Sequence, residues 1–126
     1  MLLNRLSQLV DSQPNSIFFK GENYSVTFEA LAFAIGGRTN SLAGVGITSG
    51  LRIAIILDSS QDIIEMILSC WQLGAIPILI PHEVVSREKS KLLDISNPQV
   101  IISNWRIADD LIDLDIPVFP IEELSQ

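Results

Sequence analysis

The sequence predicts an α/β domain, with a mostly parallel sheet of about four strands, helices on both faces, and a preceding helix and small β-hairpin. Runs of apolar residues begin at Arg52, Ala75, Gln99 and Ile116, and helical patterns lie between them. Strands that alternate with helices in this way are joined by right-handed crossovers and run parallel. The first run, residues 52–57, is apolar after its arginine, as expected for a strand with both faces covered.

Composition indicates one folded domain over residues 1–126. Apolar residues make up 48% of the chain and charged residues 18%, which is far from the composition of disordered proteins. The formal net charge of −7 opposes nucleic-acid binding, because such binding needs Lys and Arg side chains that neutralise phosphates. The single cysteine, Cys70, cannot form an internal disulfide, so we expect a reducing compartment such as the cytoplasm.

The beginning of the chain is expected to form a helix and a hairpin. Leucines within residues 2–10 recur at helical spacing, and Pro14 ends that helix. Residues 21–23 are a turn candidate between two short extended segments, residues 17–20 and 24–26.

A long helix is expected to follow the hairpin. Thr27 offers its hydroxyl as a cap, apolar residues fall near one face over residues 28–42, and Gly44 ends the helix. The adjacent Gly36 and Gly37 each cost about 1 kcal/mol of helix stability relative to alanine, unless a neighbour packs closely there.

Three more helices are expected between the buried strands. Residues 61–73 are apolar on most sides, which predicts a helix beneath more than one neighbour, with Gly74 in a left-handed turn at its end. The other two helices are expected at residues 86–96 and 105–112. The strands are expected at residues 52–57, 75–80, 99–103 and 116–120.

Several ordered segments carry a family resemblance. They are Thr27-Phe28-Glu29 at the start of the long helix, a Gly-Val turn into the first buried strand within residues 44–55, Leu73-Gly74-Ala75 before the second strand, and residues 87–103, which end in Ile-Ser. In this order they resemble the opening of the adenylate-forming superfamily, which includes acyl-CoA synthetases, adenylation domains of peptide synthetases and luciferases. The resemblance covers residues 2–103. Residues 71–75 are also similar to o-succinylbenzoate-CoA ligases.

Two positions depart from the superfamily pattern. An acidic residue usually follows the glycine that opens the first buried strand, whereas Leu51 follows Gly50 here. The proline after the second core motif usually lies two or three residues further along, whereas this chain has Pro77 and Pro81. These departures leave the subfamily open.

The resemblance implies that the chain is the N-terminal segment of an ATP-dependent, AMP-forming carboxylic acid–CoA ligase that works through an acyl-adenylate. The complete enzyme would use ATP, Mg²⁺ and CoA, but the family's phosphate loop and catalytic lysine lie in later segments. We therefore expect no catalytic, cofactor-binding or metal-binding residue here, and no activity from this segment alone. It would shape one wall near the acyl or aryl substrate, and its partner would be the remainder of the ligase chain or a separate downstream subunit.

A second interpretation is a non-catalytic stand-alone interaction module, or half of a split adenylating enzyme. Self-association is also expected, because the helix at residues 61–73 is strongly apolar and a covering layer is missing. No membrane span is expected, because the longest apolar stretch, residues 63–81, is interrupted by Glu65, Gln72 and Pro77.

Two glycine patterns resemble nucleotide-binding motifs but stand in the wrong surroundings for them. Thr48-Ser49-Gly50 resembles the start of a phosphate loop, but it leads into a buried strand with no lysine nearby. Gly44, Gly46 and Gly50 precede a strand, whereas a dinucleotide fingerprint follows one, so that a helix N-terminus faces the phosphates.

Isolated candidates for chemistry also have structural interpretations. His82 follows the second strand at the carboxyl edge of the sheet, where it could touch a substrate or be held by a local hydrogen bond. Asp58 could belong to an acidic receiver-type site, but the third strand ends in Ser103 rather than an aspartate, so Asp58 is interpreted as a helix cap. Cys70 lies on a buried helix without a nearby histidine and is interpreted as a core thiol.

Two further groups of residues are interpreted without ligands. Trp71 and Trp105 are expected to be core or packing residues, because no basic residues interleave with them. An acidic group lacks the glycine and alternating spacing of a calcium loop and is interpreted as a solvated face. Its members are Asp109, Asp110, Asp113 and Asp115.

Overall fold

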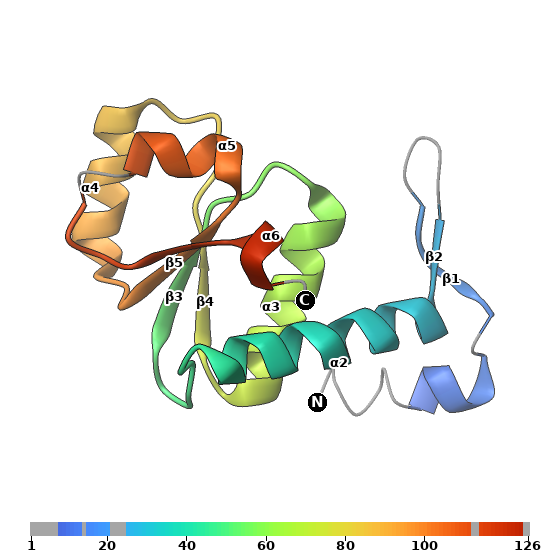
Figure 1. Ribbon diagram of the computed structural model, residues 1–126. Coiled ribbons are helices and arrows are strands. Elements are labelled where there is room, and N and C mark those ends of the chain that lie inside the picture. The colour runs from blue at the N-terminus through green and yellow to red at the C-terminus, as the bar shows by residue number, and fades with distance from the viewer. Residues whose placement is uncertain (1–7, 14, 21–24, 112–113, 125–126) are drawn as a thin grey trace.

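Four parallel strands form the main sheet, in the spatial order β4, β3, β5, β6 (Figure 1). The computed structural model describes residues 8–13, 15–20, 25–111 and 114–124. The strands are β3 (Arg52–Ile55), β4 (Ile76–Leu79), β5 (Val100–Ser103) and β6 (Val118–Pro120). The parallel α/β sheet predicted from the alternating pattern is therefore confirmed.

A helix lies in each connection between consecutive strands of this sheet. The labelled helices are α2 (Phe28–Gly44), α3 (Ser60–Leu73), α4 (Ser86–Ser96), α5 (Trp105–Ala108) and α6 (Ile121–Leu124). The connection through α3 joins neighbouring strands, β3 and β4, whereas the connection through α4 crosses over β3 to reach β5. This crossover places α4 on the sheet face opposite α3.

The two faces of the sheet bury alternate residues of the same strands. Ile53 and Ile55 pack with Met66 and Cys70 of α3 on one face, where α2 and α6 also contribute. On the other face, Ala54, Ile56 and Ile101 of the sheet pack against Leu93 of α4 and Ile107 of α5. Because successive strand residues point to opposite faces, a strand covered on both sides must be apolar throughout. This explains the unbroken apolar run at residues 53–57.

The predicted hairpin is present and stands apart from the main sheet (Figure 1). It consists of β1 (Ile17–Lys20) paired antiparallel with β2 (Ser25–Thr27), and the residues proposed for its turn lie outside the described residues. Val26 of β2 packs with Leu31 and Ile35 of α2 and Leu68 of α3. This small cluster attaches the hairpin to the N-terminal end of α2. Residues 8–12 are helical, and the rest of the predicted first helix lies outside the described residues.

The ends of α2 and α3 follow the predicted capping chemistry. The Thr27 hydroxyl accepts a hydrogen bond from the Ala30 amide at 3.1 Å, and Gly74 ends α3 with φ +75°. A side chain at Gly74 would be strained by that φ and would also meet Ser49, because a Cβ there would lie 2.8 Å from the Ser49 hydroxyl. The glycine in the Leu-Gly-Ala motif is therefore required by backbone geometry.

Three details differ from the sequence-based expectations. The helix expected at residues 105–112 is a short α5 followed by a 3₁₀ helix, Asp109–Leu111. The short α6 was not predicted, because four residues are too few for helical periodicity to be recognised. Finally, the strands are shorter than the segments expected for them, although the amides of Ile56 and Ile80 still donate to neighbouring strands, to the carbonyls of Ile102 at 2.9 Å and Ile55 at 3.0 Å.

No helix in the described part of the chain has both the length and the apolar character needed to cross a membrane.

Candidate functional site

The carboxyl ends of the parallel strands meet at one edge of the sheet, which is where open α/β sheets bind ligands. Asp58 follows β3, His82 follows β4, Asn104 follows β5, and Glu122 lies just after β6. This carboxyl edge of the sheet is therefore the candidate functional site.

A polar network joins the ends of β3 and β5. Asn104 donates a hydrogen bond from Nδ2 to Oδ1 of Asp58 at 3.0 Å, and Arg106 forms an ion pair with the other oxygen of Asp58. The Asn104 side-chain oxygen also accepts from the Ile107 amide at 2.8 Å and so caps α5. The network thus fixes the start of α5 against the end of β3.

Asp58 is not the cap of α3, so that interpretation is wrong. The helix begins at Ser60, and the capping residue is Ser59, whose hydroxyl accepts from the Asp62 amide at 3.4 Å. The side chain that accepts from the first turn belongs to the residue directly before the helix, and Asp58 lies one position too early. Its carboxylate instead neutralises Arg106.

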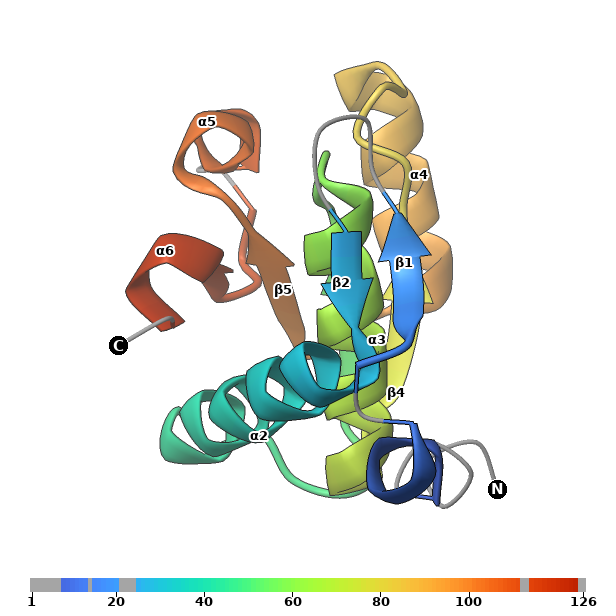
Figure 2. The same cartoon turned by 90° about the vertical axis from the view of Figure 1, so that its right-hand side faces the viewer.

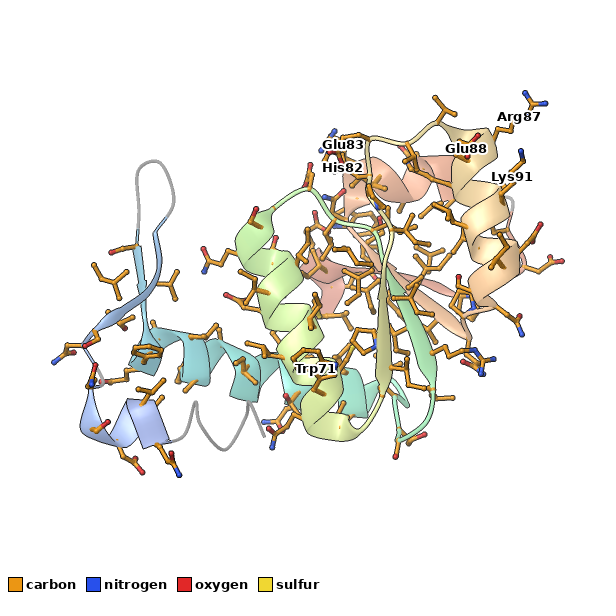
Figure 3. The ribbon with its side chains drawn as sticks, turned by 180° about the vertical axis from the view of Figure 1, so that it is seen from behind. Trp71, His82, Glu83, Arg87, Glu88 and Lys91 are labelled. Atoms are coloured by element: carbon orange, nitrogen blue, oxygen red, sulfur yellow. The ribbon has the colours of Figure 1, made fainter. Side chains whose placement is uncertain are left out.

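His82 lies in the loop after β4 and has a local partner (Figure 3). Its Nδ1 lies 2.8 Å from Oε1 of Glu83. Figure 3 also shows Arg87 and Lys91 on the outer side of α4, pointing away from His82. Arg87 and Lys91 therefore do not converge with the histidine on a pocket for an anion, and the contact with Glu83 agrees with the expected local partner of His82.

Thr48-Ser49-Gly50 does not have the geometry of a phosphate loop. Thr48-Ser49-Gly50 lies at the amino end of β3, on the edge opposite His82 and Asp58. The Gly50 amide donates to the Gly74 carbonyl at 2.9 Å, so this N–H is occupied by the chain itself. A phosphate loop needs free backbone amides at the start of a helix. We assign no step of ATP chemistry to these residues.

The remaining candidates are structural or surface residues. Cys70 is fully buried in the core, and burial raises the pKa of its thiol to about 11, which confirms a core thiol rather than a nucleophile. Among the described residues, no group of three or more His, Cys, Asp or Glu side chains is arranged to hold a metal ion. Asp109 and Asp115 are exposed, whereas Asp113 lies outside the described residues.

The two tryptophans, expected to be core or packing residues, are not in the core. Trp71 is 44% exposed at the end of α3, and Trp105 is 56% exposed at the start of α5. Trp105 lines a hollow of about 300 Å³ beside the edge strand β6, with both apolar residues and Asp109 in its lining. Leu111, Leu114 and Val118 form much of its wall.

One polar group at the carboxyl edge was not predicted from the sequence. The Ser103 side chain is fully buried at the end of β5, and its hydroxyl has no hydrogen-bond partner in the described part of the chain. The sequence shows only a serine at the end of an apolar strand. Its burial could not be predicted from that, because burial depends on the elements packed around Ser103.

The fold was compared with solved structures. VinN in complex with L-aspartate matches with a TM-score of 0.89 and 20% sequence identity, over 98% of this chain and 36% of VinN. O-succinylbenzoate coenzyme A synthetase (MenE) from Bacillus subtilis, in complex with AMP, matches with a TM-score of 0.86 and 21% identity, over 95% of this chain and 32% of MenE. This is the fold of adenylate-forming enzymes. The resemblance inferred from ordered motifs is thus confirmed at the level of the fold.

Other comparisons set the limits of this similarity. A four-domain nonribosomal peptide synthetase bound to AMP and glycine matches with a TM-score of 0.87 and 21% identity, over 98% of this chain and 9% of that protein. This chain therefore spans about a third of VinN and MenE and a much smaller part of the synthetase. No family model matches the sequence. No curated protein matches it either.

Proposed function

We propose that this chain is the N-terminal segment of an AMP-forming carboxylic acid–CoA ligase. The observation that carries the proposal is the agreement in fold with VinN and MenE over almost the whole chain, although the chain spans only about a third of each enzyme. The complete enzyme would bind ATP, Mg²⁺ and CoA through segments other than this one. Its reaction would join a carboxylate to AMP and then transfer the acyl group to CoA.

In this proposal the segment has an architectural role. Its buried parallel sheet would support the ATP-binding segments, and the carboxyl edge around Asp58, His82 and Asn104 would form a wall near the acid substrate. Arg106 holds Asp58, and Glu122 holds the start of α5 by accepting from the Trp105 amide at 3.0 Å. These contacts would keep the wall rigid rather than take part in proton transfer.

ATP–pyrophosphate exchange with a panel of carboxylic acids tests the proposal in two steps. The 126-residue chain alone is expected to give no acid-dependent exchange. If the reading frame continues, or a neighbouring frame encodes the rest, the longer polypeptide or the pair is expected to give exchange with at least one acid. Exchange by the 126-residue chain would contradict its proposed inactivity, and a complete polypeptide without exchange would contradict the ligase assignment.

A stand-alone or split-enzyme form is the second candidate, and one observation favours it. Helices from within this segment pack on both faces of the sheet, so its two main cores are built from its own residues. A segment with its own cores could fold by itself, and the exposed Ile76 and Leu79 of the edge strand β4 could then contact a separately encoded subunit. The DNA that follows the gene separates the two candidates, because a split enzyme needs a second reading frame with a phosphate loop and a lysine.

A further inference from the structure

Helix α2 forms the outer layer on its side of the molecule (Figures 1 and 2). Its inner face buries Leu31, Ile35 and Leu42 against the body of the protein. Self-association was expected to use α3, but α2 covers much of that helix, and Leu68 and Cys70 of α3 are buried. The most exposed large apolar side chain of the described residues lies on α2 instead.

A protruding ring and a shallow gap lie next to each other on this outer face. Phe33 is 86% exposed, which is the highest exposure among the large apolar side chains of the described residues. Gly36 and Gly37 follow it by three and four positions, so they lie on the same side of the helix. A Cβ placed at either glycine would meet nothing within 4 Å.

Nothing within the described part of the chain accounts for the glycine pair. Neither residue has a positive φ, so neither glycine is needed for backbone geometry. In the middle of a helix, glycine lowers stability relative to alanine. A close approach by another backbone or a large side chain would account for both positions.

We propose that the outer face of α2 binds the same face of a second copy of this chain. In a twofold-symmetric pair, each surface must complement itself. Two antiparallel α2 helices related by an axis near residue 35 would place each Phe33 over the Gly36-Gly37 gap of the other copy. The ring and the gap are complementary and lie on opposite sides of that axis, which a symmetric interface requires.

The charge distribution also favours a second copy at this face. The chain has a formal net charge of −7, so two copies repel each other in most relative orientations. The exposed residues of α2 include one charged side chain, Glu29, which lies in the first turn, away from the proposed axis. In contrast, α4 exposes Arg87, Glu88, Lys91 and Asp94. The outer face of α2 therefore allows close contact with little electrostatic cost.

Sedimentation velocity on the 126-residue chain over a concentration series tests the proposal. The expected result is a species of twice the 13.9 kDa monomer mass that dissociates on dilution. Phe33→Asp is expected to abolish this species. The matched control is Ile95→Asp, which adds the same charge at an apolar residue that is 83% exposed on α4, and it is expected to leave the dimer intact.

A second variant separates dimer loss from a folding defect. Gly37→Leu fills the gap while replacing glycine by a better helix former, so its melting temperature is expected to rise as the dimer is lost. A wild-type chain that stays monomeric at its highest soluble concentration would overturn the proposal. A monomer is also the result expected if other parts of a ligase, rather than a second copy, cover α2. A dimer that survives both Phe33→Asp and Gly37→Leu would also overturn it. The ligase proposal is tested by exchange activity, so the result on dimer formation does not decide it.

Discussion

Arg38 of α2 donates a hydrogen bond from Nε to Oε1 of Glu65 in α3 at 3.1 Å. The two side chains are only 15% and 5% exposed. Arg38 also contacts Asp62 through Nη2 at 3.1 Å, and Gln61 donates to the second carboxylate oxygen of Glu65 at 3.0 Å. Both oxygens of a buried carboxylate are thus satisfied, and the charged group ties α2 to α3.

Replacing Arg38 by alanine is expected to destabilise the protein by about 3–5 kcal/mol, because Glu65 would keep a buried charge without its cation. Urea unfolding followed by circular dichroism measures the loss. The double variant Arg38→Met with Glu65→Met removes both charges and is expected to recover most of the lost stability. Equal stability losses in the single and double variants would contradict the buried ion pair as the cause.

The Asp62 carboxyl gives a pH-dependent prediction. Burial raises its pKa above the ordinary value of 3.8, Arg38 opposes that rise, and Glu65 and Glu122 add to it. Between 3.8 and the raised pKa the folded state binds more protons at this site than the unfolded state, so this group's contribution to stability falls as pH increases. Asp62→Asn cannot ionise, so its stability relative to wild type is expected to increase through that window and then level off.

Unfolding free energies of both proteins between mildly acidic and neutral pH give the difference curve for Asp62. Asp94 is the matched control, because it is exposed on α4. Asp94→Asn is expected to give a nearly flat difference curve. A curve for Asp62→Asn that slopes the opposite way would show that the Arg38 charge outweighs burial at this site.

Asn104 has two structural roles that substitutions can separate. Its oxygen caps α5 and its Nδ2 donates to Asp58. Asn104→Ala loses both contacts and is expected to cost about 1–2 kcal/mol. Asn104→Asp keeps an acceptor for the Ile107 amide but places a carboxylate beside Asp58. It is therefore expected to be less stable than wild type at neutral pH and to regain stability on acidification.

Cys70 is expected to resist alkylation in the folded protein. Burial raises the pKa of its thiol to about 11, so the reactive thiolate is scarce at neutral pH, and the side chain is fully buried. Iodoacetamide labelling followed by mass spectrometry should detect modification in denaturant but very slow modification without it. Equal labelling rates in the two conditions would contradict the core position of this thiol.

Local chemistry made much of the fold predictable from the sequence. The Thr27 cap, the left-handed Gly74 and the apolar run at residues 53–57 each depend on a few neighbouring residues, and each appears where it was expected. The parallel direction of the strands also followed, because a helix between two strands returns the chain to the same starting edge. That Thr48-Ser49-Gly50 is not a phosphate loop could likewise be inferred from the order of elements.

The candidate site was less predictable, because its contacts join distant parts of the chain. Asp58 and Asn104 are 46 positions apart, and they meet only because β3 and β5 are neighbours in the sheet. Without that pairing, Asp58 looked like a helix cap. Whether Trp71 and Trp105 lie in the core or pack at the surface was unpredictable for a similar reason, since exposure depends on which neighbours cover a side chain.

The sequence by itself determined the four strands of the main sheet to within a few residues, the helices α2, α3 and α4, and the parallel direction of the sheet, because these properties arise from spacing and capping within short stretches. Only the tertiary structure decided the strand order, the burial of Glu65 opposite Arg38, and the exposure of Phe33 beside Gly36 and Gly37. Those features depend on which faces pack together, and the free energy of packing is shared among residues far apart in the chain.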